Sequence, residues 1–247
     1  MQSQLDKLLK ARTIAIIGAS NRAGSVGYGV MKNMLNAGYG GVIYPVNIKE
    51  SAVQGVRAYA SINQVPEAVD LGVICTPAAT VPDIVEDCGK LHIGGLIIIS
   101  AGFAEAGEKG RQLYHQVQHN AQKYKMRIIG PNCLGIINPR LGINASFAPK
   151  MALPGKLALI SQSGALLTSI LDWSVDQRVG FSHYVSLGSM MDIDFAALID
   201  YFGTDQYTSC ILIYMESMKD ARRFMSAAKA ISRYKPIIVL KAGRGAE

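Results

Sequence analysis

The residues from Gly18 to Ser20 form the part of the sequence best suited to binding an anion. They follow an apolar, β-branched run from Thr13 to Ile17, which is typical of a strand buried on both faces of a parallel sheet. Glycine lets the backbone turn steeply out of such a strand. The free N–H groups at the start of the next helix attract phosphate. The pattern therefore predicts a phosphate-binding turn, Gly18-Ala19-Ser20, at the carboxyl edge of an α/β sheet.

The sequence after the second strand favours a nucleotide with an additional phosphate. Glycines at 18, 24, 27 and 29 do not fit the G-x-G-x-x-G dinucleotide fingerprint, and no Gly-Lys-Ser/Thr of an ATP-type P-loop occurs. An NAD site places Asp or Glu at the end of its second strand, whereas the strand Val42–Val46 runs into Asn47, Ile48 and Lys49. A lysine there would attract a phosphate, which indicates coenzyme A or NADP. The alternative is an ordinary surface lysine.

Composition and charge narrow the class of protein. The 247 residues are 49% hydrophobic and 17% charged, which suits one large or two ordinary domains with well-buried sheets. The net charge of +7 comes from scattered basic residues, so we expect no nucleic-acid binding. No apolar run approaches the ~18 residues of a membrane span, and residues 1–10 do not resemble a signal peptide. The four cysteines form no C-x-x-C pair, and we expect a reducing, cytoplasmic compartment.

Strand and helix patterns alternate along the first half of the chain. Such alternation predicts a doubly wound parallel sheet, here a Rossmann-like domain over residues 1–131. The predicted strands are 13–17, 42–46, 71–75, 96–100 and 127–129, and the predicted helices are 26–37, a helix capped by Thr80, and 108–124.

The second half begins after a segment without clear periodicity. Residues 132–155 contain several Pro, Gly and Asn, which predicts a linker that packs over the cleft. A second α/β pattern covers 156–247. It stops directly after a strand, and a parallel strand normally needs a covering helix. We therefore expect this domain to be incomplete and the chain to be part of a longer protein.

Eight short motifs occur in register over nearly the whole chain, and no single one is diagnostic. They are 16–20 (IIGAS), 44–47 (YPVN), 98–103 (IISAGF), 130–135 (GPNCLG), 144–147 (NASF), 161–165 (SQSGA), 186–188 (SLG) and 241–244 (KAGR). Together they resemble the nucleoside-diphosphate-forming acyl-CoA synthetases, a family related to the α subunit of succinyl-CoA synthetase. The resemblance implies a Rossmann-like CoA-binding domain followed by a flavodoxin-like domain.

The resemblance implies that the first domain binds coenzyme A. It places the CoA phosphates at Gly18, Ala19 and Ser20, and the nucleotide end at Lys49. Other residues that follow strands would line the groove or lie near the reactive thiol: Pro77, Ser100, Ala101 and Asn132. No metal site is predicted, because the i, i+4 pair His115 and His119 lacks an acidic partner of the zinc-protease type.

In the family, the second domain handles phosphate. Ser163, Gly164 and Ala165 open a helix directly after a strand, and a helix N-terminus can hold phosphate. The alternative is a hydrolase elbow with Ser163 as nucleophile, but G-x-S-x-G is required and Ser161 occupies the first glycine position. The resemblance assigns Glu216 the task of orienting a catalytic histidine. The alternative for Glu216 is a solvated loop residue.

The resemblance also implies a reaction. In the family, acyl-CoA and phosphate give acyl phosphate and CoA, and a histidine then passes the phosphoryl group to ADP or GDP. That histidine would lie beyond Glu247, so we expect the chain alone to be inactive. ADP/ATP or GDP/GTP and Mg²⁺ would bind outside this chain, in an ATP-grasp domain or subunit. We expect the full-length protein to be oligomeric.

Two other functions stay open at this point. Related chains carry the same domains fused to a protein lysine acetyltransferase, where the synthetase part senses CoA or acyl-CoA without catalysing a reaction. The other alternative is an NADP-dependent oxidoreductase. Neither the acyl substrate nor the choice between ADP and GDP can be deduced from the residues present.

Overall fold

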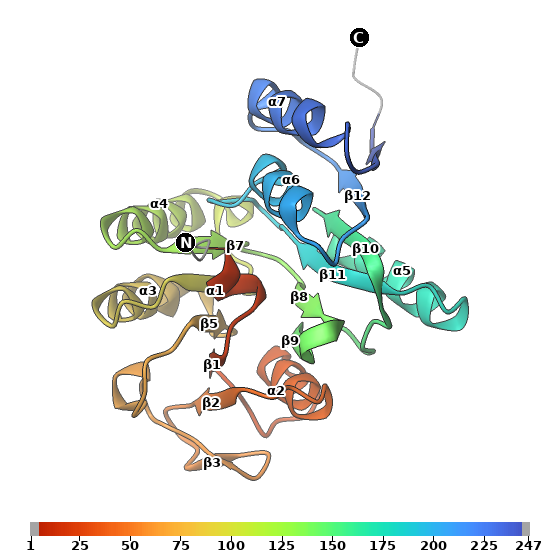
Figure 1. Cartoon of the computed structure of the whole chain (residues 1–247). Helices are drawn as coiled ribbons and strands as arrows, with labels where there is room; N and C mark the ends of the chain where they lie inside the picture. The colour runs from red at the N-terminus through yellow and green to blue at the C-terminus, as the bar shows by residue number, and fades with distance from the viewer. Residues whose placement is uncertain (1–4, 244–247) are drawn as a thin grey trace.

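The chain folds around two large sheets (Figure 1), and the computed structural model describes residues 5–243. Arg244, in the last motif, lies outside the described residues. The first sheet is parallel and has the strand order β2-β1-β5-β6-β7. Its strands are β1 (Thr13–Ile17), β2 (Val42–Val46), β5 (Leu71–Ile74), β6 (Gly95–Ile98) and β7 (Arg127–Ile129), and a short hairpin, β3 (Ala52–Val53) and β4 (Val56–Arg57), follows β2.

Helices cover both faces of this sheet, because each strand is apolar on both sides. Ile14 and Ile16 of β1 pack toward α1 (Asp6–Leu9) and α2 (Val26–Asn36), and the alternate residues of β1 belong to the core under α3 and α4. Figure 1 shows α3 (Val81–Lys90) and α4 (Glu108–Lys123) side by side on one side of the sheet. The predicted doubly wound, Rossmann-like fold is confirmed.

The second sheet is mixed, with the order β13-β12-β10-β11-β8-β9. Its parallel strands are β10 (Pro154–Ser161), β11 (Phe181–Ser186), β12 (Cys210–Met215) and β13 (Ile237–Lys241), and its helices are α5 (Gly164–Asp176), α6 (Phe195–Thr204) and α7 (Ala221–Ile231). This arrangement confirms the flavodoxin-like second unit. No helix within residues 5–243 has the length and apolar character needed to span a bilayer.

The segment 132–155, which we expected to be a linker, contains an antiparallel hairpin. Its strands β8 (Gly135–Asn138) and β9 (Ile143–Ser146) extend the second sheet through β11. Each strand has four residues, and all of them are buried. β8 (GIIN) has no alternation of polar and apolar residues, and β9 (INAS) alternates over only four residues. Neither strand is long enough to reveal itself by a period-two pattern.

The start of α3 also differs from the prediction. The Thr80 side chain makes no capping bond to α3. A 3-10 turn, Ala78–Thr80, precedes the helix, and Thr80 already has helical backbone angles. Its hydroxyl instead bonds to Thr76 Oγ1 and the Pro77 carbonyl, both at 2.9 Å.

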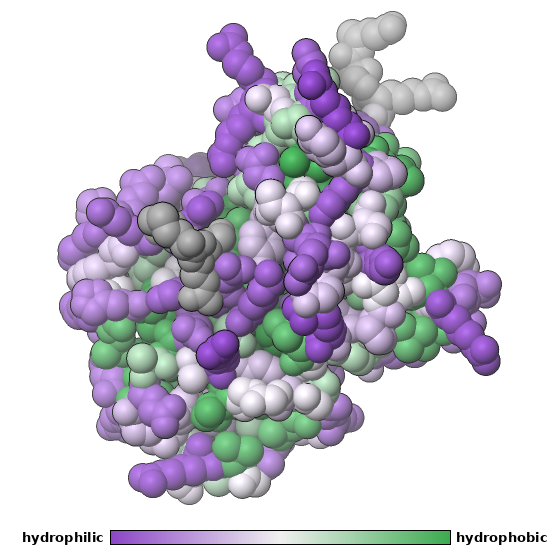
Figure 2. All heavy atoms as spheres, viewed as in Figure 1, coloured by the Kyte–Doolittle hydropathy of each residue, from purple (hydrophilic) through white to green (hydrophobic). Residues whose placement is uncertain are grey.

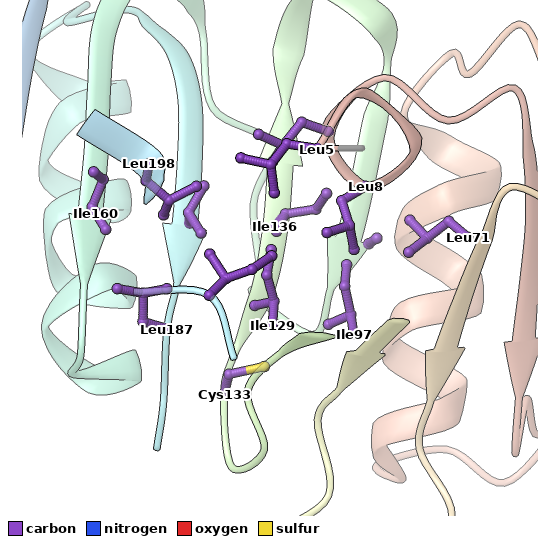
Figure 3. Packing of buried hydrophobic residues seen from close by; sticks show 14 of the residues in the cluster. Leu5, Leu8, Leu71, Ile97, Ile129, Cys133, Ile136, Ile160, Leu187 and Leu198 are labelled. Carbon is purple, nitrogen blue, oxygen red and sulfur yellow. The ribbon is translucent and has the colours of Figure 1, made fainter. Parts of the chain in front are cut away.

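One hydrophobic core extends across both sheets (Figure 3). Leu8 of α1, Ile97 of β6 and Ile129 of β7 contribute to it from the first unit. Ile136 of β8 and Leu198 of α6 contribute from the second, and all five side chains are at most 1% exposed. Because side chains of both units are buried in this shared core, the two units are held in a fixed arrangement.

Side-chain hydrogen bonds reinforce this arrangement. Asn33 of α2 donates through Nδ2 to the carbonyls of Ser146 and Ala148, each at 2.7 Å. Asn138 of β8 donates to the Leu9 carbonyl at 2.9 Å. Because these amides bridge segments far apart in the sequence, α1 and α2 are tied to the hairpin β8–β9.

The outer strand β13 leaves apolar side chains in contact with solvent. Ile238, Val239 and Leu240 are 58%, 43% and 62% exposed, although they continue the sheet from β12. Figure 2 shows apolar surface on the right-hand side of the view, where the second sheet lies in Figure 1. The described part of the chain therefore leaves this edge of the sheet uncovered.

The close approach of α2 to β1 gives a stability prediction. A Cβ on Gly27 would overlap the Gly18 carbonyl oxygen, whereas a Cβ on Gly29 would lie 3.4 Å from Phe147 Cβ, an ordinary contact. Alanine within a helix normally gains about 1 kcal/mol over glycine, so Gly29→Ala should stabilise the chain. Gly27→Ala should instead cost about 1–3 kcal/mol, because the helix must move. Urea denaturation of both variants measures the difference, and equal effects would contradict the prediction.

Candidate functional site

A cleft of about 1220 Å³ lies at the carboxyl ends of the first sheet's strands and reaches the start of α5. Both units contribute to its walls. Its lining residues are Gly18, Ser20, Arg22, Gly24, Ser25, Val26, Gly27, Asn47, Lys49, Glu50, Cys75, Thr76, Pro77, Ile99, Ser100, Ala101, Asn132, Cys133, Leu134, Phe147, Gly164, Ala165 and Thr168. Nine of the predicted CoA and phosphate residues come from distant parts of the sequence and meet in this cleft. They are Gly18, Ser20, Lys49, Pro77, Ser100, Ala101, Asn132, Gly164 and Ala165.

The turn after β1 stands at the switch point of the first sheet, between β1 and β5. Gly18 has φ +90°, and a Cβ there would lie 2.9 Å from Thr76 Cγ2. Ala19 is fully buried and does not line the cleft. Its carbonyl accepts a hydrogen bond from Asn47 Nδ2 at 2.7 Å, so it shapes the turn through its backbone.

The N-terminus of α2 faces the cleft. Ser25 caps this helix, because its hydroxyl accepts the Tyr28 N–H at 3.2 Å. Ser25, Val26 and Gly27 all line the cleft. The first N–H groups of a helix have no acceptor within it, and the helix dipole adds positive potential there. This end of α2 can therefore bind phosphate oxygens.

Lys49 is positioned by a turn that Asn47 closes. Asn47 Oδ1 accepts the N–H groups of Lys49 and Glu50 at 2.8 and 3.1 Å, which brings both residues to the cleft. Arg22 lies on the same side, because its neighbour Asn21 donates to Glu50 Oε2 at 3.3 Å. The sequence analysis identified Lys49 but missed Arg22 and Glu50. The Asn-x-Lys-Glu order is the signal that could have revealed Glu50.

The remaining predicted residues of the first unit lie along the base of the cleft. The Ser100 hydroxyl donates to the Thr76 carbonyl, and the Ser100 carbonyl accepts the Asn132 N–H at 3.0 Å. These bonds join the ends of β5, β6 and β7 into one surface. Pro77 and Ala101 complete this surface with uncharged side chains.

Two cysteines lie in the cleft wall, but they are not reactive thiolates. Burial raises the pKa of both Cys75 and Cys133 to about 12, and for Cys75 the nearby Cys133 adds to the effect. The thiol of Cys133 donates to the Ile98 carbonyl at 3.3 Å. Because the thiolate is the nucleophile, neither side chain is suited to covalent catalysis near neutral pH.

The start of α5 closes the other end of the cleft. Gly164, Ala165 and Thr168 line it, but Ser163 does not. The Ser163 hydroxyl accepts the Leu166 N–H at 3.3 Å and so acts as the helix N-cap. In the described part of the chain this hydroxyl contacts a helix N–H and no histidine base, which argues against a hydrolase elbow.

Glu216 lies outside the cleft, at the end of β12. Gln162, which precedes α5, accepts the N–H groups of Glu216 and Ser217 at 2.6 and 2.9 Å through Oε1. Lys241 Nζ donates to the Glu216 carbonyl at 3.0 Å. The backbone of Glu216 is thus fixed beside the α5 turn, while its carboxylate is exposed to solvent. This position is compatible with the predicted role, which stays a prediction.

The second cavity, the histidines and the acidic residues of the described chain do not form a comparable site. A second cavity of about 560 Å³ lies between α1 and α6, but Lys10 there already contacts Asp6 at 3.3 Å and Asp205 at 3.7 Å. The four histidines do not line the larger cleft. Among residues 5–243, no cluster of His, Cys, Asp and Glu has the arrangement to hold a metal ion.

Two protein-family models match this chain, one for each of the two units that line the cleft. A model described as "CoA binding domain" matches residues 12–139. A model described as "Succinyl-CoA ligase like flavodoxin domain" matches residues 154–247. The chain belongs to the NDP-forming acyl-CoA synthetase family. The resemblance inferred from the eight motifs is thereby confirmed.

Several known proteins are similar to this chain in sequence and structure. The α subunit of acetate–CoA ligase [ADP-forming] I of Pyrococcus furiosus is 47% identical over 97% of this chain and 53% of its own length. A crystal structure from Pyrococcus horikoshii has 44% identity and a TM-score of 0.93 over 97% of this chain and 55% of that one. The acetyl-CoA synthetase 1 of Ca. Korarchaeum cryptofilum, solved with phosphate and ADP, has 36% identity and a TM-score of 0.93, covering 97% and 52%. The chain spans about half the length of these relatives.

The raised pKa values of the two thiols predict how the cleft cysteines react with alkylating reagents. Both thiols have a pKa of about 12, so the thiolate fraction of Cys75 and Cys133 keeps rising with pH until the pH reaches that value. Their alkylation by iodoacetamide should therefore accelerate about tenfold per pH unit between about pH 7 and pH 10. The urea-unfolded chain, with ordinary thiols, should level off near a pH of about 9. Peptide mass spectrometry separates the sites, and a plateau below about pH 9 in the folded chain would refute the burial argument.

Proposed function

We propose that this chain is the coenzyme A- and phosphate-binding portion of an ADP-forming acyl-CoA synthetase. The observation that carries the proposal is the meeting of two anion-binding helix ends in one cleft, those of α2 and α5. The names of the relatives support the ADP-forming ligase class.

The two ends of the cleft suit the two ends of the thioester. Arg22 and Lys49 supply positive charge beside the turn after β1, where the phosphates of CoA would bind. Gly164 and Ala165 present the N-terminus of α5 at the opposite end, where inorganic phosphate would bind. CoA stretched along the cleft would therefore bring its thioester to the phosphate.

This arrangement supports an acyl transfer by proximity. A phosphate oxygen at α5 would attack the thioester carbonyl, the carbon–sulfur bond would break, and acyl phosphate and the CoA thiol would leave. The helix N-terminus would hold the phosphate in place and stabilise its charge. Glu216 directly follows β12, the strand that pairs with β10, and would orient the histidine that later accepts the phosphoryl group.

The rest of the reaction would need groups outside residues 1–247. We propose that the nucleotide and Mg²⁺ bind an ATP-grasp domain or partner subunit, and that the assembly is oligomeric and cytoplasmic. The α-subunit name of the Pyrococcus furiosus relative supports a partner subunit. The comparisons give no support to the acetyltransferase alternative.

The role of Lys49 can be tested by ligand binding. Lys49→Ala should weaken CoA about fivefold, or ~1 kcal/mol, because a screened contact to the 3′-phosphate is lost. Dephospho-CoA lacks that phosphate, so its dissociation constant should change less than about twofold. Isothermal titration calorimetry at constant ionic strength measures both constants.

Lys32→Ala is the matched control, because Lys32 is an exposed lysine of α2 that does not line the cleft. It should leave both ligands unaffected. Equal losses for CoA and dephospho-CoA in Lys49→Ala would remove Lys49 from the nucleotide end. Absence of CoA binding to the unmodified chain, or tighter binding of NADP, would overturn the proposed function.

A further inference from the structure

Phe147 is an exposed aromatic residue inside the cleft. Its side chain is 43% exposed, and it follows β9 directly. Of the large apolar side chains exposed in the described part of the chain, only Phe147 and Val26 line the cleft. Exposed apolar surface in a ligand cleft commonly marks the place where an apolar part of the ligand packs.

The backbone around Phe147 is held firmly in place. The carbonyls on both sides of it, those of Ser146 and Ala148, accept hydrogen bonds from Asn33 Nδ2 at 2.7 Å. The Ala148 N–H donates to Ser146 Oγ at 3.2 Å. A ring on such a fixed backbone can act as a rigid wall.

Phe147 stands at the α5 end of the cleft. Gly135 pairs with Ser146, so Leu134 and Phe147 directly flank the last pair of the hairpin. Leu134 in turn reaches α5, because its Cβ lies 3.5 Å from the place where a Gly164 Cβ would be. On the other side, Phe147 Cβ lies 3.4 Å from a Cβ built on Gly29, and Val26 is one helical turn away from Gly29.

The charged side chains lie elsewhere in the cleft. The charged residues that line it are Arg22, Lys49 and Glu50, and they belong to the loops after β1 and β2. Around α5 the lining side chains are uncharged, including those of Leu134, Phe147 and Thr168. Beyond the backbone N–H groups of α5, which would hold phosphate, the side chains at this end therefore suit an uncharged group.

We propose that Phe147 forms the wall that contacts the acyl group of the thioester and limits its size. This inference rests on the proposed function, because that function places the thioester beside α5. An acyl group extending from the thioester would meet the Phe147 ring, and a terminal carboxylate there would find no cation among the described cleft residues of this end.

Butyryl-CoA and succinyl-CoA test the proposal, since their acyl chains have equal length and differ in a terminal methyl or carboxylate. In calorimetry, the unmodified chain should bind butyryl-CoA about fivefold tighter than CoA or succinyl-CoA. Phe147→Ala should reduce the advantage over CoA to less than about twofold and leave the affinity for CoA itself unchanged. Phe147→Trp should lower the affinity for butyryl-CoA relative to acetyl-CoA, because a larger ring shortens the space.

Trp173→Ala provides the matched control, because Trp173 is an aromatic residue of α5 that is 58% exposed and outside the cleft. It should not change any ratio of affinities. Thermal unfolding verifies that each variant folds, and the Trp variant remains a test if the Ala variant does not. Unchanged ratios in a folded Phe147 variant, or equal weakening of CoA and butyryl-CoA, would overturn the inference alone. Failure of the unmodified chain to bind CoA would overturn the proposed function as well.

Discussion

The apolar core that runs from Leu8 and Ile97 to Ile136 and Leu198 holds the two sheets of this protein together. Because both units share these buried side chains, moving one against the other would expose apolar surface to water. The hydrogen bonds of Asn33 to the strand β9 restrict the same movement. The walls of the cleft belong to both units, so their positions relative to each other are fixed as well. A ligand spanning it therefore meets helix ends whose separation is already fixed, so less ordering is required on binding.

The charge and polarity of the lining residues change from one end of the cleft to the other. Positive charge and backbone N–H groups gather near Gly18 and Lys49, whereas apolar and small residues gather near Phe147 and Gly164. A thioester of coenzyme A has the same gradient, with phosphates at one end and an acyl group at the other. The cleft can therefore orient such a molecule in a single direction. Because the pKa of the Cys75 and Cys133 thiols is raised to about 12, neither would compete with phosphate as a nucleophile for the proposed thioester.

The sequence was informative where a local pattern directly reflects a physical requirement. The strand β1 and the turn at Gly18 were predictable, because a buried parallel strand must be apolar and a steep exit needs glycine. The hairpin β8–β9 was not, because its two strands have only four residues each and neither has a solvent-facing side. Phe147 was part of a motif, but the backbone beside it is held by Asn33, more than a hundred residues away in the sequence. Long-range packing of this kind leaves no trace in local spacing.

The uncovered strand β13 has a practical consequence for work on the isolated chain. An outer strand presents a row of unpaired backbone groups, and charged or twisted residues normally prevent it from adding to another strand. In β13 the exposed side chains of Ile238, Val239 and Leu240 are apolar, and the strand carries one charged residue, Lys241, at its end. Edge-to-edge stacking of molecules should therefore increase with concentration. Attraction between apolar surfaces weakens on cooling, so dilute, cold preparations suit calorimetry on this protein better than warm, concentrated ones.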